Sequence, residues 1–191
     1  MKRINKRVLK GGNMLNPAPV VMVSCGNTPD EYNIITVAWA GTICSDPPMC
    51  YISVRPERHS YGIIKERGEF VINLVNENLV AVTDWCGVRS GKKFNKFLET
   101  NLTPVKANKV GAPLIYESPI NLECVVKQIV TLGSHDMFIA EIVAVNADEI
   151  LFDKKSNAME LKRANLVTYS HGHYYGLGKI LGKFGFSVAK K

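Results

Sequence analysis

The sequence predicts a mainly β fold, a closed antiparallel barrel with a few peripheral helices. Two long runs of alternating apolar residues, 121–132 and 137–146, are separated only by the turn residues 133–136 and predict a hairpin. Two further runs rich in β-branched residues, 34–44 and 49–54, flank a proline-rich turn. No G-x-G-x-x-G sequence follows a predicted strand, which argues against a doubly wound nucleotide-binding sheet. Many strands with few helical patterns favour a closed antiparallel barrel.

The proline-rich turn is Ser45-Asp46-Pro47-Pro48. Proline has a fixed φ and no backbone N–H, so these residues cannot lie inside a central strand. An earlier apolar run, 20–25, predicts a buried strand that a hairpin loop at 26–33 joins to the next strand. This part of the chain is therefore predicted to consist of strands joined by short loops.

The helical patterns are short and lie between or after these strands. Residues 60–67 predict a helix that ends at Gly68, because glycine readily adopts the left-handed conformation found after helix ends. The apolar run 69–75 predicts the strand that follows. Helical spacing also occurs in three later segments, 79–86, 92–98 and 159–165. A glycine-rich tail completes the chain.

The length of 191 residues fits a single domain, 1–191, that buries a core without disulfides or metals. Residues 1–15 are basic and are predicted to form an N-terminal extension or a first short strand. They lack the apolar segment of a signal peptide. No run in the chain approaches the roughly 20 apolar residues that span a bilayer. We therefore expect a cytoplasmic protein that does not enter a membrane.

The cysteines indicate the redox environment. They are odd in number, widely spaced and free of C-x-x-C pairs, which argues against a disulfide framework and against a zinc site. Reduced thiols of this kind are typical of a cytoplasmic protein. The residues concerned are Cys25, Cys44, Cys50, Cys86 and Cys124.

The formal net charge of +7 raises the question of a nucleic-acid partner. Much of this charge lies in the first ten and the last thirteen residues, and no basic stripe with interleaved aromatic residues lies between them. We therefore interpret the charge as a solvated surface that attracts anionic cofactors. Binding of nucleic acid is not expected.

The first of the two strands beside the proline turn carries small residues, Ala38, Ala40 and Gly41, where bulky side chains are usual. Small residues let a flat ligand approach the backbone, so that polar groups of residues 36–42 can bond its edge. The alternative is a plain core strand crossed closely by a helix. Trp39 would then fill the core or a subunit contact.

An anion site is predicted shortly after this strand pair. Arg55 directly follows the second strand, and Ser60 opens the predicted helix. The arginine fork suits phosphate, and the free N–H groups at a helix start favour an anion. A flat polar ring with a phosphate a short distance away has the shape of flavin mononucleotide (FMN). The alternative is that Arg55 and Arg58 pair on the surface with Glu57 or Glu66.

Two further polar segments carry less information. The loop Ser90-Gly91-Lys92 is small and cationic but lacks the spacing of a P-loop, so nucleotide hydrolysis is not implied. His171 and His173 stand two residues apart with no third ligand nearby, which is a weak metal signal. No metal site is expected. The tail that contains these histidines is predicted to pack around the cofactor or across a dimer seam.

A series of short segments occurs along the chain in the order Asp46-Pro47-Pro48, Arg55, Ser60-Tyr61, Cys86-Gly87, Ser90-Gly91, Lys96-Phe97, Asn121-Leu122-Glu123-Cys124, Gly133-Ser134-His135-Asp136 and Tyr169-Ser170-His171-Gly172. In this order the series resembles the flavin reductase-like family, the FMN-binding split barrels, and most closely its flavoredoxin branch. The resemblance covers residues 17–191. It rests on the ordered set and not on any single motif.

The resemblance implies an FMN-binding split β-barrel, antiparallel and Greek-key-like, with the flavin ring against residues 36–42. It places His135 near the ring, to orient a nicotinamide donor or to stabilise negative charge on the reduced ring. The alternative for His135 is an exposed turn histidine. A catalytic role is therefore predicted for His135, and cofactor-binding roles for Thr36, Ala38, Trp39, Ala40, Thr42, Arg55, Ser60, Tyr61, Ser90 and Lys96.

The function implied is that of an FMN-binding oxidoreductase, a flavin reductase or flavoredoxin. It would pass a hydride or electrons through FMN from NAD(P)H or a protein donor. The alternative is an FMN-binding electron carrier or flavin-holding module without NAD(P)H turnover. A heme or pyridoxal phosphate binder of the same barrel type is a remote third possibility. The resemblance also implies a homodimer with the cofactor near the subunit interface.

Overall fold

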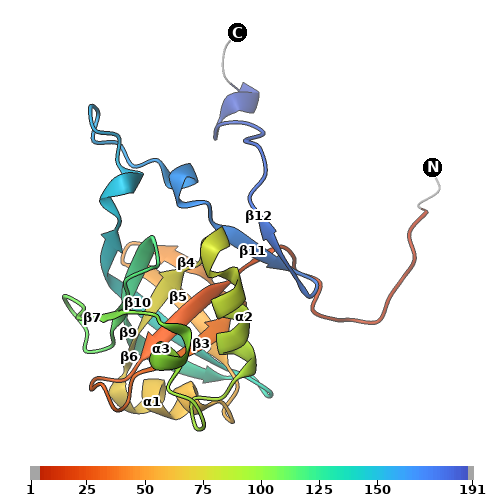
Figure 1. Ribbon diagram of the computed structural model, residues 1–191. Helices are drawn as coiled ribbons and strands as arrows, with labels where there is room; N and C mark the ends of the chain where they lie inside the picture. Colours follow the sequence, from red (N-terminus) through yellow and green to blue (C-terminus); the bar gives the residue numbers. More distant parts are fainter. Residues whose placement is uncertain (1–4, 189–191) are drawn as a thin grey trace.

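The computed structural model describes residues 5–188, which contain β-strands, α-helices and short 3-10 helices (Figure 1). The strands are β1 (Ala18–Pro19), β2 (Val21–Cys25), β3 (Asn33–Val37), β4 (Ala40–Ser45), β5 (Pro48–Val54), β6 (Glu69–Leu74), β7 (Pro104–Val105), β8 (Leu114–Ile115), β9 (Ile120–Thr131), β10 (Asp136–Ala147), β11 (Val167–Ser170) and β12 (His173–Gly176). The α-helices are α1 (His59–Arg67), α2 (Val80–Val88) and α3 (Lys96–Thr100). Short 3-10 helices are η1 (Glu77–Leu79), η2 (Glu149–Leu151), η3 (Leu161–Ala164) and η4 (Phe186–Val188).

The main sheet has seven strands in the order β3-β2-β6-β9-β10-β5-β4, and every pairing in it is antiparallel. Only Ala38 and Trp39 separate β3 from β4, so the two edges of the sheet are joined by one continuous stretch of chain. The N–H of Ser53 in β5 donates to the carbonyl of Trp39 at 2.8 Å. The sheet therefore closes on itself, and the predicted mainly β barrel is confirmed.

The predicted single strand 34–44 is wrong in one respect, because it is two strands with a break at Ala38 and Trp39. The first half, β3, pairs with β2, and the second half, β4, pairs with β5. A chain that changes partners at a barrel corner has to bend there, and small residues ease such a bend. The corner lies where the flavin ring was predicted to bind.

The predicted long hairpin is β9 and β10, which pair from Asp136 opposite Thr131 to Ala147 opposite Ile120. Two register shifts interrupt the pairing, one on either side of the stretch Ala140–Ile142, and such bulges increase the bend of a strand. β10 pairs with β5 on its other side, with Asp136 opposite Val54. The turn that carries His135 is therefore held beside the end of β5, which Arg55 directly follows.

The apolar residues form two main cores, one inside the barrel and one between the barrel and α2 and α3. β2 shows the division, because Val21 and Val23 lie in the inner core, whereas Met22, like Val20 just before the strand, lies in the outer one. A strand covered on both faces is expected to be continuously apolar, as this one is. Figure 1 shows α2 and α3 beside β3, and α2 also packs on β2.

The helix predicted at 60–67 is α1, and Gly68 ends it in the left-handed conformation with φ of 68°. The helix predicted at 92–98 is wrong in its bounds, since α3 begins only at Lys96. The Asn95 side chain accepts from the N–H of Leu98 and so caps the helix start. Residues 91–93 form a turn instead. The segment predicted as helical at 159–165 contains only the 3-10 helix η3.

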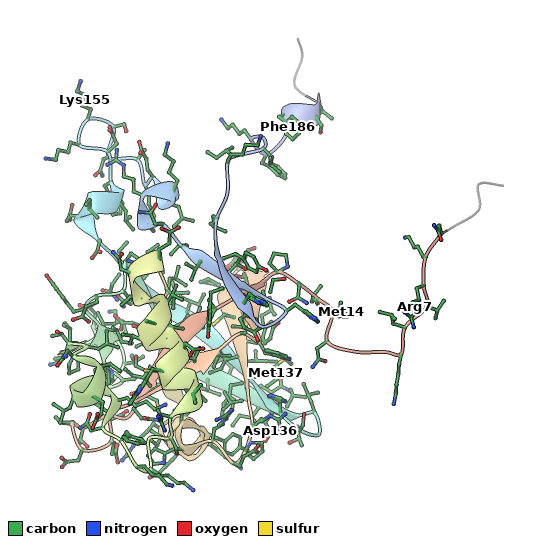
Figure 2. The ribbon with its side chains drawn as sticks, turned by 45° about the vertical axis from the view of Figure 1, so that its right-hand side comes forward. Arg7, Met14, Asp136, Met137, Lys155 and Phe186 are labelled. Carbon is green, nitrogen blue, oxygen red and sulfur yellow. The ribbon has the colours of Figure 1, made fainter. Side chains whose placement is uncertain are left out.

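The tail contains a hairpin that sequence analysis did not predict. β11 pairs with β12, and β1 pairs with β11 to give a second, three-stranded sheet beside the barrel. Residues 5–15 contain no helix or strand, so this part of the predicted extension is not a strand; residues 1–4 and 189–191 lie outside the described residues. The chain before β1 and after β12 extends away from the barrel, as Arg7 and Phe186 show in Figure 2. Between residues 5 and 188, no helix is long and apolar enough to cross a membrane.

One carboxylate fixes a loop to the outside of the barrel. Glu123 in β9 is fully buried and accepts hydrogen bonds from the backbone N–H groups of Asn108 and Lys109 and from the side-chain amides of Asn108 and Asn146. Burial alone would raise the pKa of this carboxyl, but these donors outweigh it and hold the pKa below its usual value. The charged form of Glu123 is thus part of the folded structure.

Candidate functional site

A groove runs along β3 and consists of two cavities of about 340 and 370 Å³. The two share Ile35, Arg58 and Gly87 in their walls, so they lie side by side. The smaller cavity lies between the start of α1 and the end of α2, and we call it the cationic end. The larger lies around residues 35–39 and the His135 turn, and we call it the ring end.

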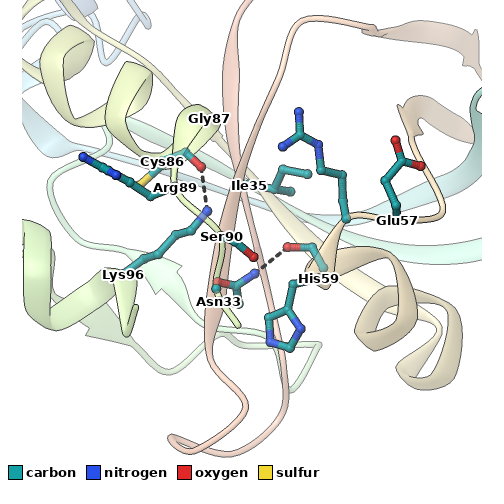
Figure 3. Close-up of a pocket in the computed structure, with 12 residues that line it drawn as sticks. Asn33, Ile35, Glu57, His59, Cys86, Gly87, Arg89, Ser90 and Lys96 are labelled. Atoms are coloured by element: carbon teal, nitrogen blue, oxygen red, sulfur yellow. Dashed lines mark hydrogen bonds between the residues drawn. The ribbon is translucent and has the colours of Figure 1, made fainter. Parts of the chain in front are cut away.

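The cationic end is lined by three basic side chains, those of Arg58, Arg89 and Lys96, and by one carboxylate, that of Glu57. Figure 3 shows Arg89 and Lys96 on the α2 and α3 side, with Glu57 and His59 on the α1 side. Burial and the positive charges of Lys92 and Lys96 lower the pKa of His59, so the potential here is positive. This end of the groove is suited to an anion.

Lys96 is the most unusual of these residues, because its side chain is only 3% exposed yet carries an ammonium group. Its Nζ donates to the carbonyls of Ile34 at 2.7 Å and Cys86 at 2.6 Å. An ammonium has three donors, so one remains for the groove. Across residues 5–188 no carboxylate forms a salt bridge with it. Burial, with a smaller effect of Arg58, lowers the pKa of Lys96.

The start of α1 adds further donors. Ser60 is buried, and its Oγ accepts a hydrogen bond from the side-chain amide of Asn33 at 2.7 Å. Figure 3 draws this bond as the dashed line that starts at Asn33. The first N–H groups of a helix have no acceptor within the helix, and the helix dipole favours negative charge there. Ser60 therefore keeps its hydroxyl proton for a ligand. Asn33 holds it in place.

The ring end presents an unpaired strand edge. β3 pairs only with β2, and the carbonyl of Ile34 points away from β2 toward Lys96. Because the N–H and C=O of one strand residue face the same edge and alternate along the strand, the backbone groups of Thr36 also face the groove. The Thr36 side chain is occupied, since its Oγ1 donates to the carbonyl of Thr83. Backbone groups are thus left for a polar ligand edge.

His135 and Trp39 both line the ring end. Their rings lie 4° from parallel with centroids 6.3 Å apart, and Trp39 is 45% exposed. The Nδ1 of His135 lies 2.9 Å from the hydroxyl of Ser134. His135 is therefore a half-buried residue of the groove wall and not the freely exposed turn histidine of the alternative interpretation.

Arg55 also lines the ring end, so both interpretations of this residue apply in part. Its Nη1 lies 3.5 Å from a carboxylate oxygen of Glu57, with both side chains about half exposed or more. Exposed ion pairs of this length contribute about 0–1 kcal/mol. The guanidinium of Arg55 is therefore available to a ligand at little cost.

Of the other predicted cofactor-binding residues, Ala38 lines the ring end and Ser90 the cationic end, whereas Tyr61, Thr42 and Ala40 lie outside the groove. The hydroxyl of Tyr61 donates to Asp136 at 2.6 Å, because one step along a helix from Ser60 turns the side chain by about 100°. Thr42 is exposed on β4, and Ala40 faces a separate cavity. Their positions do not support cofactor contacts.

Sequence analysis missed Arg89 and Asn33, which line the cationic end. It predicted that the tail packs around the cofactor or across a dimer seam but named no tail residue for the site, and Tyr169 and Tyr174 of the β11–β12 hairpin line the ring end. The hydroxyl of Tyr174 donates to Asp84 of α2 at 2.9 Å, and burial together with this carboxylate raises the pKa of Tyr174 to about 12. Alternating Val, Tyr and His residues around Gly172 were the available signal for this hairpin.

Gly91 permits the closest contact in the cationic end, which leads to a prediction. A Cβ at this position would overlap Oδ1 of Asn33 and lie 2.7 Å from Cδ2 of His59. We expect Gly91→Ala to displace the loop that carries Arg89, and to weaken binding of a phosphate-bearing ligand such as FMN about tenfold, roughly 1.4 kcal/mol. Titration followed by flavin fluorescence measures the change.

The matched control is Gly62→Ala, within α1, where a Cβ would meet nothing within 4 Å. That change should raise the free energy of unfolding by about 0.5–1 kcal/mol, since alanine is the better helix former, and should leave the affinity alone. Equal affinities for Gly91→Ala and the unaltered chain would show that the loop does not need this contact.

No group of three or more His, Cys, Asp or Glu side chains within residues 5–188 is arranged to hold a metal ion. His173 lies in the β12 strand with its Nδ1 3.1 Å from the carbonyl of His171.

A closed antiparallel barrel with a cationic groove along one unpaired strand edge defines a split-barrel protein of the flavin reductase type. The family model for the flavin reductase like domain matches residues 14–178. The chain belongs to this family, and the predicted resemblance is confirmed.

Solved structures and relatives agree with this family assignment. The flavoredoxin of Desulfovibrio vulgaris (Miyazaki F) is similar with a TM-score of 0.87 and 31% identity, over 97% of this chain and 100% of that chain. A flavoredoxin from Methanosarcina acetivorans has the same fold, with a TM-score of 0.86 and 23% identity over 97% and 100% of the two chains. A protein of Archaeoglobus fulgidus is 33% identical over 66% of this chain and 71% of its own length. Family membership supports a flavin-binding oxidoreductase as the class of this protein.

Proposed function

We propose that this protein is an FMN-dependent oxidoreductase that receives a hydride or electrons from NAD(P)H or a protein donor and passes them onward. The observation that carries the proposal is the groove itself. Its cationic end offers a site for an anion, built on the buried Lys96, which has no carboxylate partner in the described chain. This site lies beside the unpaired strand edge of the ring end. FMN combines a phosphate with a flat ring that has a polar edge.

The residues present fit this cofactor. Lys96, Ser60, Arg58 and Arg89 would hold the phosphate, because charge-assisted hydrogen bonds are about twice as strong as neutral ones. The backbone edge at Thr36 would bond the polar edge of the ring, and the small side chain of Ala38 would let the ring approach. Arg55 lies at the junction of ring end and solvent, where it would meet the ribityl chain or an incoming donor.

Bound FMN supplies the capacity to take up and release a hydride. The protein supplies position and charge. His135, held beside Trp39, would orient the donor and offer a hydrogen bond to negative charge on the ring. Tyr169 and Tyr174 would limit access of water from the β11–β12 side.

An electron carrier without direct NAD(P)H turnover is the second candidate. The likeness to a flavoredoxin at 31% identity over nearly the whole chain favours it. The two candidates share the FMN site and differ only in the donor.

We also propose that the protein is a homodimer. Large apolar side chains are exposed in both terminal segments outside the barrel, and contiguous exposed apolar surface is typical of interaction sites. These residues are Val8, Leu9, Met14 and Leu15 in the N-terminal segment and Leu177, Ile180, Leu181, Phe184, Phe186 and Val188 in the C-terminal one.

A visible spectrum tests the proposed function. The protein is mixed with FMN, desalted, and then mixed anaerobically with NADH or NADPH. Retained flavin absorbance that bleaches supports the oxidoreductase, and retained absorbance that persists supports the carrier. Protein that binds no FMN, even in a direct titration, contradicts both.

His135→Ala is expected to keep FMN but to slow its reduction by NAD(P)H about 10- to 100-fold, since a misplaced donor loses rate rather than affinity for the cofactor. His173→Ala is the matched control, because His173 is exposed and lies outside both parts of the groove. An unchanged reduction rate in His135→Ala would remove this histidine from the reaction.

A further inference from the structure

A third cavity, of about 480 Å³, lies next to the ring end and shares Ala38, Trp39 and Tyr169 with it. Its volume is within the range of small-molecule sites, about 300–1,000 Å³. The wall is built from the segment before β2, the β3–β4 corner, β5 and the β11–β12 turn. Among its wall residues that the FMN proposal does not use are Leu15, Asn16, Pro17, Tyr51, His171 and Gly172.

The aromatic walls of this cavity are held in fixed positions. Tyr51 lies against the backbone of β4, where a Cβ on Gly41 would come within 2.9 Å of its ring. The ring of Tyr169 packs edge to face on Tyr174, with centroids 5.6 Å apart. Trp39 lies parallel to His135. Three aromatic rings from three different strands or corners thus face one space without having to rearrange.

The cavity differs from the cationic end in charge. None of the residues that line it is a lysine, arginine, aspartate or glutamate. Its polar side-chain groups include the amides of Asn13 and Asn16, the imidazole of His171 and the hydroxyls of Tyr51 and Tyr169. The Asn16 side chain accepts from the backbone N–H of His171 at 3.3 Å. Burying an ion in such a space is costly, whereas aromatic rings stack favourably on one another.

We propose that this cavity binds a planar, uncharged aromatic molecule, stacked among Trp39, Tyr51 and Tyr169. Rigid aromatic walls select a flat ligand, and the lack of charged lining residues selects a neutral one. Since Trp39 is common to both cavities, the ligand lies directly beside the ring end of the groove. The binding does not depend on the proposed FMN site and is tested without the cofactor.

The probe is 2-naphthol, titrated into the cofactor-free protein and followed by calorimetry and by the indole N–H signals in NMR. The chain has two tryptophans, and Trp85 packs on Phe94 away from the cavity. We expect a Kd of about 0.1 mM, as suits a ligand of this size, and a shift of the Trp39 signal alone. The sulfonate of the same ring system, 2-naphthalenesulfonate, should bind at least tenfold more weakly.

Two variants locate the site. Tyr51→Leu should weaken 2-naphthol binding at least fivefold and leave FMN affinity unchanged, because Tyr51 lines only this cavity. The control Tyr116→Leu makes the same change at an exposed tyrosine outside all three cavities and should alter neither affinity. If Tyr51→Leu fails to fold, Trp39 signals in the unaltered chain loaded with FMN still decide whether the cavity binds the probe.

Three results would overturn the proposal: no binding of 2-naphthol, equal or tighter binding of the sulfonate, or complete block of the probe by FMN. The last would place the probe in the ring end. Binding of 2-naphthol by a protein that never binds FMN would instead leave this proposal standing and remove the proposed function.

Discussion

Lys96→Met is expected to weaken FMN binding about 100-fold, roughly 2.7 kcal/mol. Methionine has a similar length and fills the same space but carries neither charge nor donors. The variant would lose the contact with phosphate and leave the carbonyls of Ile34 and Cys86 without their present donor. Equilibrium titration of cofactor-free protein with FMN, followed by fluorescence, measures the loss.

Lys93→Met is the matched control, because Lys93 is exposed and lies outside the groove. Its FMN affinity should stay within about twofold of that of the unaltered chain. Circular dichroism and thermal melting of the Lys96→Met protein without FMN separate lost binding from lost fold. A folded Lys96→Met protein that binds FMN normally would show that the buried ammonium serves only to join β3 to α2.

The same lysine gives the affinity a pH dependence. Burial lowers the pKa of Lys96, so it deprotonates at a lower pH than an exposed lysine does. FMN affinity is therefore expected to fall as the pH rises through this lowered pKa, and bound phosphate will oppose the fall by favouring the charged form. The Lys96→Met protein should lack this alkaline decline.

Glu123→Ala is expected to lower the free energy of unfolding by about 3 kcal/mol and the Tm by about 6–12 °C. The change leaves the N–H groups of Asn108 and Lys109 and the amide of Asn146 without their buried acceptor. The loop that carries Asn108 and Lys109 packs on β6 and β9, and neither this loop nor Glu123 lines the groove. FMN affinity of the folded variant should therefore be unchanged.

The acid limb of the stability curve tests the charge on Glu123. The folded pKa is lower than the unfolded one, so its contribution is present above the unfolded value, near 4.5, and is lost as the pH falls through the folded pKa. The Glu123→Ala protein should show a flatter decline over that range. Glu66→Ala, at an exposed site in α1, is the control. A Glu123→Ala protein with unaltered Tm would mean that water replaces the carboxylate.

Local patterns in the sequence were enough to predict most of the barrel. The β9–β10 hairpin follows from alternation on both sides of a glycine turn, and α1 follows from its spacing and from Gly68. Such signals depend only on residues close together in the chain. The repeat of apolar residues indicates the type of element, and glycine or proline residues indicate where it ends. The same holds for Ser60, whose position at a helix start indicates an anion site without knowledge of the partners.

The roles of single side chains were harder to predict where a residue distant in the sequence decides which way the side chain points. Tyr61 follows Ser60, yet it turns away to Asp136, 75 residues later in the chain. Arg89 was overlooked because the loop after α2 comes beside β3 and the start of α1 only in the folded chain, where Gly91 lies close to Asn33 and His59. The hairpin of β11 and β12 was overlooked because its strands are four residues each.

The sequence by itself determined most strands of the barrel, their turns and the small residues at the β3–β4 corner, because these depend on backbone preferences over a few residues. Only the tertiary structure decided which side chains share the groove. Segments around residues 33–39, 55–60, 86–96 and 169–174 meet there. Barrel closure brings them together, and only then does Lys96 become a buried charge that needs an anion.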